Sequence, residues 1–309
     1  MSLLTREEVL NQILHKKSFI KAELSTINLE DANLNQAEFI ECYLRSANLT
    51  KASGINADFS RTILRFAILS EANLTGAKLI KTELNSACLQ ETNLKEVKAN
   101  KAKLYGAKID LLEATSAQLT EADLRETTGI SANFSSANLE KANLSLANLP
   151  QANFSGAKLR HAIALKANFP NTIWRDANLE QVNFSHSNLI ESDFSQANLV
   201  AANFTAVNLT SANLQQAELL EINLQQAKLE RVNLTKADLF AANLEGATIS
   251  QVNFTEVNLQ DANLENTTWK EVNFVNCNVS NTVFTNAQGL TVEQQQWLKK
   301  NGALNIPNN

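Results

Sequence analysis

The residue types that most often perform chemistry are sparse in this chain of 309 residues. Its histidines and cysteines are widely scattered: His15, His161, His186, Cys42, Cys88 and Cys277. None of them has a partner at the spacing that holds a zinc ion. The chain has only eight glycines and contains no phosphate-binding loop, dinucleotide fingerprint or nucleophile elbow. We therefore expect no catalytic residue, no metal site and no cofactor, and we interpret the protein as a non-enzyme.

The charges and the hydropathy exclude further classes of function. The chain has 27 Lys and Arg against 32 Asp and Glu, a net charge of −5, so we do not expect it to bind nucleic acid directly. Five lysines cluster in the middle of the sequence: Lys95, Lys98, Lys101, Lys103 and Lys108. They form either a patch for an anionic partner or an ordinary solvated face. No apolar run approaches the roughly 20 residues of a membrane span, and the unpaired cysteines favour a cytoplasmic location.

A repeat of five residues positions nearly all the other side chains. Residues 131–159 read SANFSSANLEKANLSLANLPQANFSGAKL, in which a small residue, a polar residue and a large apolar residue recur together. Every fifth residue from Phe19 to Phe284 gives 54 centres, of which 49 are Leu, Phe, Ile, Val or Trp. A period of five matches neither a helix nor a flat strand. It indicates a short extended segment and a corner, repeated in one register.

The pattern of the five-residue unit predicts which of its residues face the interior and which face the solvent. The small residue and the centre are two apart, so both point to the same side of an extended segment, which we expect to be the interior. The residue between them is Asn in 26 units and should face out. The last two residues form the corner. Glycines at the second corner position predict a positive φ there: Gly76, Gly106, Gly156 and Gly246.

The aromatic centres indicate how many units make one coil. Phe19, Phe39 and Phe59 are twenty residues apart, which is four units and fits a square coil with stacked equivalent positions. The continuous A(N/D)LXX pattern resembles the pentapeptide repeat family over residues 18–289. The resemblance implies an all-β solenoid, a right-handed quadrilateral β-helix whose interior is filled by Leu, Phe and Ala.

The pattern divides the chain into a long solenoid and two end segments. We expect residues 1–17 to form an N-terminal capping helix, because Thr5 to Glu8 is a capping box. Residues 18–289 should form about 54 repeats in about 13–14 coils. Residues 290–309 should form a C-terminal capping helix and tail, with a second capping box from Thr291 to Gln294. These helices could instead serve dimerisation.

The repeat is least regular at residues 97–130. Ala99, Ala114 and Gly129 replace large centres there, and Leu111 and Leu112 form an apolar pair outside the pattern. A small centre leaves a void that costs about 1–3 kcal/mol unless its neighbours fill it. This segment either stays in the stack, with a bulge, or leaves it as a loop.

Apolar residues at outward positions are the best candidates for a binding surface. Val200, Leu220 and Phe240 follow a centre at intervals of twenty and should form a ladder on one face. A second group brings together four residues near the start of the repeat: Tyr43, Ile63, Phe66 and Ile68. Soluble proteins rarely expose contiguous apolar patches without a reason, although single surface hydrophobes are common.

Three functions fit this sequence. The first is a regulatory or scaffolding module, a rigid rod whose flat faces bind a protein partner. The resemblance allows it, because related cyanobacterial proteins include a regulator of heterocyst differentiation. The second is a DNA mimic that binds DNA gyrase, as in the quinolone-resistance branch of the family, but that mechanism requires a strongly acidic face. The third is a structural role with self-association, for example as a homodimer. We favour the first, in a bacterial, cyanobacterial-type cytoplasmic protein.

Overall fold

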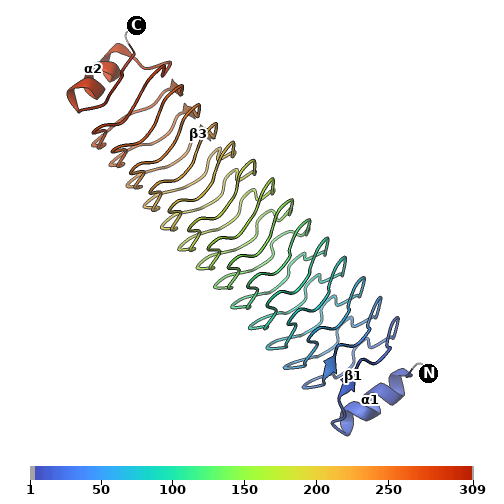
Figure 1. Cartoon of the computed structure of the whole chain (residues 1–309). Helices are drawn as coiled ribbons and strands as arrows, with labels where there is room; N and C mark the ends of the chain where they lie inside the picture. Colours follow the sequence, from blue (N-terminus) through green and yellow to red (C-terminus); the bar gives the residue numbers. More distant parts are fainter. Residues whose placement is uncertain (1–3, 308–309) are drawn as a thin grey trace. The chain divides into compact units, whose positions relative to one another are not determined.

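The computed structural model describes residues 4–307 and contains two compact units, unit 1 (Met1–Lys158) and unit 2 (Leu159–Asn309). The first three and last two residues of the predicted end segments lie outside the described residues. The helices and strands are short (Figure 1). They are α1 (Arg6–Leu14), β1 (Phe19–Ile20) and β2 (Phe39–Ile40) in unit 1, and β3 (Lys228–Glu230), β4 (Thr248–Ser250), β5 (Thr268–Lys270) and α2 (Val292–Lys300) in unit 2.

In each unit the chain returns to the same place after twenty residues. Strands β1 and β2 pair in parallel, with Phe19 opposite Phe39. Strands β3, β4 and β5 place Leu229, Ile249 and Trp269 side by side in a second parallel sheet. Most other outward positions form single parallel bridges between residues n and n+20, at four places in each coil. The fold is therefore of the parallel β-helix type, with the coil length that the phenylalanine spacing predicts.

The corners confirm the predicted positive φ but rarely contain glycine. From Lys21 to Asn286 the second corner residue has φ between 52° and 69°, a conformation that costs a non-glycine residue about 1–2 kcal/mol. Hydrogen bonds to the next coil hold this geometry. The backbone N–H of Lys21 donates to the carbonyl of Ile40 at 3.0 Å, and that of Leu111 donates to Ile130 at 2.9 Å. The stacking of coils thus offsets the strain that glycine would avoid.

The interior of each unit is a stack of the predicted centres. In unit 1 the rings of Phe134 and Phe154 lie 5.1 Å apart and nearly parallel. In unit 2, Trp174 and Phe194 stack at 5.8 Å, and all four residues are fully buried. Such pairs add about 0.5–1.5 kcal/mol beyond the burial of their area. Side chains therefore fill the interior of each unit.

Hydroxyl groups at the small inward position are buried but satisfied. The hydroxyl of Thr82 donates to the carbonyl of Phe59 at 2.7 Å, and that of Ser192 donates to Phe169 at 2.9 Å. In both cases the acceptor belongs to a centre of the preceding coil, 23 residues earlier. An unpaired buried hydroxyl would be costly, so this contact explains why Ser and Thr can replace Ala at that position.

The irregular segment 97–130 stays in register. Lys98 bridges Gln118 and Lys108 bridges Thr128, each across twenty residues. Gly129 leaves no void, because a Cβ built on it would lie 2.6 Å from the carbonyl carbon of Ile109. The neighbouring coil has therefore closed over the missing side chain, and the segment forms no projecting loop.

Helix α1 begins at the predicted capping box, in which Thr5 and Glu8 each bond to the other's backbone N–H. Val9 is buried, and the guanidinium of Arg6 donates to the carbonyls of Asn28 and Glu30. The other residues of the predicted apolar stripe are less buried than Val9. Leu14 is 81% exposed, and with Leu10 and Ile13 it lines an open groove of about 770 Å³ beside the first coils.

Helix α2 has the second predicted capping box, between Thr291 and Gln294. Trp297 stacks on Phe274 at 5.8 Å, and Leu298 is fully buried. The amide of Gln294 also donates to the carbonyl of Val272 at 2.7 Å. Both apolar and polar contacts therefore attach α2 to the last coils of unit 2.

Candidate interaction surfaces

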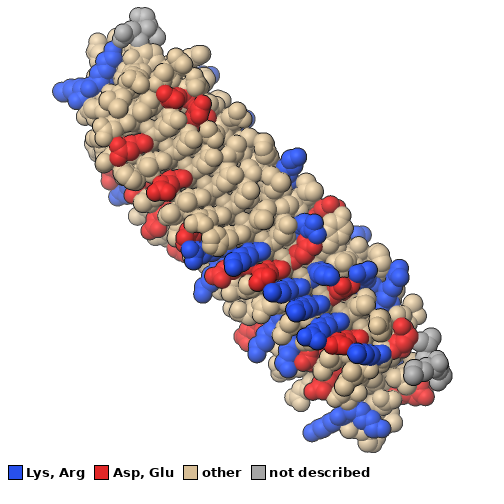
Figure 2. Space-filling view, in the orientation of Figure 1, with Lys and Arg blue, Asp and Glu red and all other residues tan. Residues whose placement is uncertain are grey.

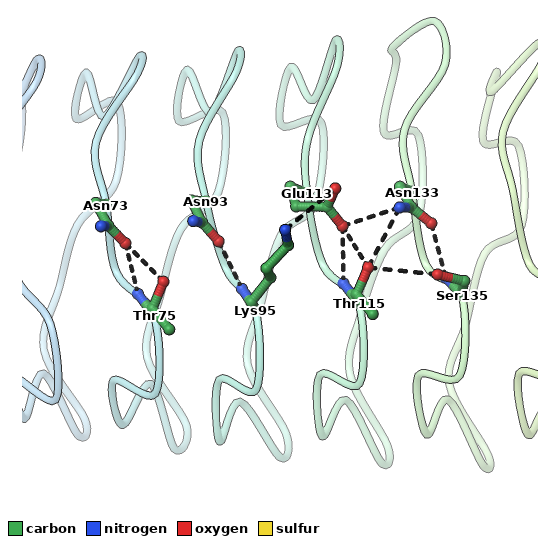
Figure 3. A network of polar contacts seen from close by, with 8 residues as sticks. All are labelled: Asn73, Thr75, Asn93, Lys95, Glu113, Thr115, Asn133 and Ser135. Carbon is green, nitrogen blue, oxygen red and sulfur yellow. Dashed lines mark hydrogen bonds and ion pairs between the residues drawn. The ribbon is translucent and has the colours of Figure 1, made fainter.

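The outward asparagines form ladders that fix the corners, as Figure 3 shows for one face of unit 1. Asn73 Oδ1 accepts hydrogen bonds from the backbone N–H of Thr75 at 3.1 Å and from its hydroxyl at 2.7 Å. One coil further on, Asn93 accepts from the N–H of Lys95 at 3.1 Å. This bond satisfies an N–H at the corner that the β-bridges leave free. It gives the physical reason for the recurrence of Asn at this position.

A carboxylate at the same position links neighbouring coils (Figure 3). Glu113 accepts from the N–H of Thr115 at 3.3 Å and from the amide of Asn133 at 2.9 Å. The ammonium of Lys95 lies 3.9 Å from its other oxygen. The side chains of this face are thus held on several sides. A surface that is already ordered loses little conformational entropy when a partner binds.

Four of the residues proposed from the sequence lie on two successive bridge columns of unit 1 and at the corner between them. Tyr43 and Ile63 are bridge partners on adjacent coils, and the Arg45 guanidinium lies 5.4 Å from the centre of the Phe66 ring. Tyr43, Phe66 and Ile68 are 44%, 51% and 44% exposed, while Ile63 is partly buried. We refer to Tyr43, Arg45, Ile63, Phe66 and Ile68 as the aromatic patch.

Ion pairs border the aromatic patch. Arg65 Nε donates to Glu83 at 2.7 Å, and Lys103 Nζ donates to the other oxygen of Glu83 at 2.9 Å. The hydrogen bond from Lys103, and then that from Arg65, hold the pKa of Glu83 below its usual value although partial burial acts against them. The Glu83 carboxylate therefore stays ionised at neutral pH and keeps both basic side chains in place.

A second aromatic contact in unit 1 was missed in the sequence. The Arg125 guanidinium lies 5.6 Å from the centre of the Tyr105 ring, and the Tyr105 hydroxyl donates to Glu126 at 2.8 Å. That hydrogen bond, with the nearby negative charge, raises the pKa of Tyr105. The available signal was the twenty-residue spacing, because Arg45, Arg65, Tyr105 and Arg125 occupy the same corner position in different coils.

The three other residues proposed from the sequence line up in unit 2. The N–H of Ala201 donates to the carbonyl of Leu220 at 2.8 Å, and that of Glu221 donates to Phe240 at 2.9 Å. Val200, Leu220 and Phe240 therefore occupy equivalent positions on successive coils. All three are partly buried, and we refer to them as the apolar ladder. The two groups belong to different units.

The lysines of the sequence cluster lie on several faces of unit 1 instead of forming one patch. Lys101 forms an ion pair with Glu121 at 3.2 Å. Within residues 4–307, Lys98 and Lys108 form no ion pair. Lys98 follows Lys78 directly in a column of bridges, whereas Lys108 follows Cys88 in another. Only part of the cluster is therefore available as unpaired positive charge.

No three His, Cys, Asp or Glu side chains among the described residues could hold a metal ion together. Burial raises the pKa of both Cys42 and Cys277 to about 11, so these thiols are protonated at neutral pH and are poor nucleophiles. Helices α1 and α2, the two helices of the described part, have nine residues each and are too short to cross a bilayer.

Known protein families match most of the chain. The family of pentapeptide repeats (8 copies) matches residues 22–53, 57–95, 114–145, 131–163 and 253–288. The family described as pentapeptide repeat region matches residues 158–239. No curated protein is similar enough to be counted as a relative.

Several solved structures are similar to this chain. HetL, a pentapeptide repeat protein involved in heterocyst differentiation regulation from the cyanobacterium Nostoc sp. strain PCC 7120, is 27% identical over 72% of this chain and 89% of its own, with a TM-score of 0.40. A protein from the thylakoid lumen of Arabidopsis thaliana is 33% identical over 38% and 79%, with a TM-score of 0.21. QnrB1, a plasmid-mediated fluoroquinolone resistance protein, is 17% identical over 74% and 96%, with a TM-score of 0.31.

Proposed function

The chain belongs to the pentapeptide repeat family, and on this basis we propose that it is a non-enzymatic module that binds another protein through the flat faces of its coils. The observation that carries the proposal is the aromatic patch of unit 1. Trp, Tyr and Arg side chains dominate the binding energy of protein interfaces, and here Arg45, two residues along the chain from Tyr43, lies over the Phe66 ring.

The geometry of the patch suits a docking surface. Phe66 is half exposed at a corner whose backbone is fixed by a hydrogen bond from its own N–H to the carbonyl of Asn85 at 3.1 Å. Arg45 covers one side of its ring. The side chains are therefore presented by a rigid backbone, and a partner would bury them without first ordering a loop.

We infer a right-handed, four-sided solenoid over residues 18–289, with α1 and α2 covering its ends. The buried Val9 and the stacking of Trp297 on Phe274 support that role for the helices. We place the module in the reducing cytoplasm, because its described cysteines are free thiols.

DNA mimicry remains the alternative function, with DNA gyrase as the target. Unit 1 has 18 basic and 18 acidic residues, and unit 2 has 9 and 14. A surface that imitates DNA needs a dense row of negative charge, and the lysines of unit 1 interrupt such a row. A supercoiling assay with purified gyrase separates the two functions, because the protein-binding proposal expects no inhibition by this chain.

The test compares two variants at corners of the same geometry. Phe66→Asn removes the exposed ring of the patch, and Leu111→Asn removes an exposed side chain elsewhere in unit 1. Both residues have positive φ, 60° and 53°, and similar exposure, 51% and 53%. Asn tolerates this backbone conformation well, so both variants should fold.

Each protein is immobilised and exposed to native lysate from its source cells, and the retained proteins are quantified by mass spectrometry. We expect one protein to be retained by the wild type and by Leu111→Asn, and to be reduced at least about tenfold by Phe66→Asn. Equal retention of every protein by all three would overturn the proposed role of the aromatic patch.

A further inference from the structure

The two units differ strongly in charge. Unit 1 is neutral overall, whereas unit 2 carries the entire net charge of −5. In the view of Figure 2, basic side chains gather on unit 1, while much of the visible surface of unit 2 is uncharged. The distribution raises the question of whether the positive side chains of unit 1 have a counterpart outside their own unit.

One face of unit 1 carries lysines on adjacent coils. Asp58, Lys78 and Lys98 are successive bridge partners, so Lys78 and Lys98 lie next to each other. We define the lysine face as the following set of residues: Arg61, Lys78, Ile80, Lys81, Lys98 and Lys101. Like charges on neighbouring strands repel. Within unit 1, Arg61, Lys78 and Lys101 form ion pairs with Glu41, Asp58 and Glu121. Neither Lys81 nor Lys98 has an ion-pair partner among residues 4–307.

The equivalent positions in unit 2 carry the opposite charge. Glu218 and Asp238 are bridge partners on adjacent coils, and the apolar ladder runs beside them. We define the acidic face as the following set of residues: Glu218, Leu220, Glu221, Asp238, Phe240 and Asp261. In the described part of the chain, none of its four carboxylates forms an ion pair with Lys or Arg.

The charged positions of the two faces match. Residues 98–101 read KANK and residues 218–221 read ELLE, and both segments occupy the same four positions of their five-residue units. In both units the coils pair at intervals of twenty residues, so both have the strand spacing of about 4.8 Å. Opposite charges on two such surfaces therefore stay aligned over several coils.

We propose that the lysine face of one copy docks on the acidic face of a second copy, with the coils running in opposite directions. In this register, Lys98 meets Glu218 and Lys101 meets Glu221. One coil further, Ile80 packs on Phe240, which is partly buried already.

Two more pairs follow from the same register. Lys78 meets Asp238, and Arg61 meets Asp261. Both pairs form only if the two copies are stacked in opposite directions. Successive coils toward Arg61 on one copy then lie opposite successive coils toward Asp261 on the other. A single contact of this kind joins two copies.

The lysine and acidic faces contain no residue of the aromatic patch, so this inference and the proposed function can fail separately. Charge pairs of this kind supply specificity and speed of association. They are screened by salt, since the Debye length is about 10 Å at 0.1 M ionic strength. The dimer should therefore weaken as salt is added.

The test is a charge exchange followed by sedimentation equilibrium. One variant combines Lys98→Glu with Lys101→Glu, and the other combines Glu218→Lys with Glu221→Lys. We expect the dissociation constant of the wild-type dimer to rise at least about tenfold in each variant alone. An equimolar mixture of the two should dimerise again, because each reversed face then meets a complementary one.

A control variant reverses two lysines of unit 1 outside the proposed face, Lys51→Glu with Lys108→Glu, and should dimerise like the wild type. Circular dichroism verifies that every variant is folded. A wild type that is monomeric at low salt, variants that dimerise unchanged, or a mixture that stays monomeric would each overturn the proposed contact.

Discussion

The carbonyl carbon of Ile109 lies 2.6 Å from the point where a Cβ on Gly129 would be. These residues are twenty apart and occupy equivalent centres of adjacent coils. At Gly54 the nearest atom to such a Cβ is instead the side-chain Cδ2 of Leu74, at 2.7 Å. A side-chain methyl can rotate away, whereas the backbone of Ile109 is fixed by the hydrogen bonds of the stack.

Gly129→Ala should therefore destabilise unit 1 more than Gly54→Ala does. We expect a loss of about 2–3 kcal/mol for the first, because the added methyl must separate two coils, and about 1 kcal/mol or less for the second. Chemical denaturation monitored by circular dichroism measures both. Equal midpoints for the two variants would show that the coils are not packed as closely at Gly129 as the structure describes.

The adjacent residues Leu111 and Leu112 should respond in opposite ways to the same substitution. Leu111 is 53% exposed and has φ of 53°, whereas Leu112 is 1% exposed. Leu111→Asn should be neutral or stabilise by about 0.5 kcal/mol, since Asn adopts the left-handed conformation more easily. Leu112→Asn should cost at least about 3 kcal/mol, because it places an amide in the core. Thermal unfolding of both variants measures the difference, and similar melting temperatures would contradict the assignment of inside and outside.

The ion pairs of Glu83 should make unit 1 sensitive to acid. Its pKa is lowered in the folded state from the ordinary value of 4.5, first by the hydrogen bond from Lys103 and then by Arg65. The resulting stabilisation is present above pH 4.5 and is lost as the pH falls through the lower folded pKa. The denaturation midpoint of the wild type should thus decrease more between pH 6 and pH 3 than that of Glu83→Gln. Identical decreases would show that the pair does not contribute.

The cysteines should differ in reactivity although all three are free thiols. Burial raises the pKa of Cys42 and Cys277 to about 11, and the thiolate is the reactive form. Cys88 lies at an outward position and is partly exposed. Iodoacetamide at pH 8 should therefore modify Cys88 in the folded protein well before the others, as measured by peptide mass mapping. Modification of Cys42 at the same rate would contradict its burial.

The five-residue pattern predicted the fold because each position of the unit has one physical role. The interior centres and the twenty-residue stacking follow from the spacing, and the positive φ of the second corner residue follows from the glycines at that position. Both capping boxes were also visible, because Thr5 and Thr291 each stand three residues before a side chain that can return the hydrogen bond.

Contacts between coils were harder to predict. The spacing identifies Gly129 as a small centre, but only the packing shows that Ile109 has closed the expected void. The candidate surfaces were found from single apolar residues, so the pairing of Arg125 with Tyr105 was missed. That pair forms between side chains of adjacent coils. The position of each residue in the repeat does not show which neighbour its side chain contacts.

The central structural claim is that the chain returns to the same face after twenty residues. It is tested by disulfide formation in a Cys88→Ser background. Asn203 and Asn223 are bridge partners, and Cα atoms of adjacent strands are within the reach of a disulfide. Asn203→Cys with Asn223→Cys should form an intramolecular disulfide on mild oxidation, whereas Asn203→Cys with Glu218→Cys should remain reduced. A disulfide in the second pair and none in the first would indicate a three-sided coil of fifteen residues and contradict the account.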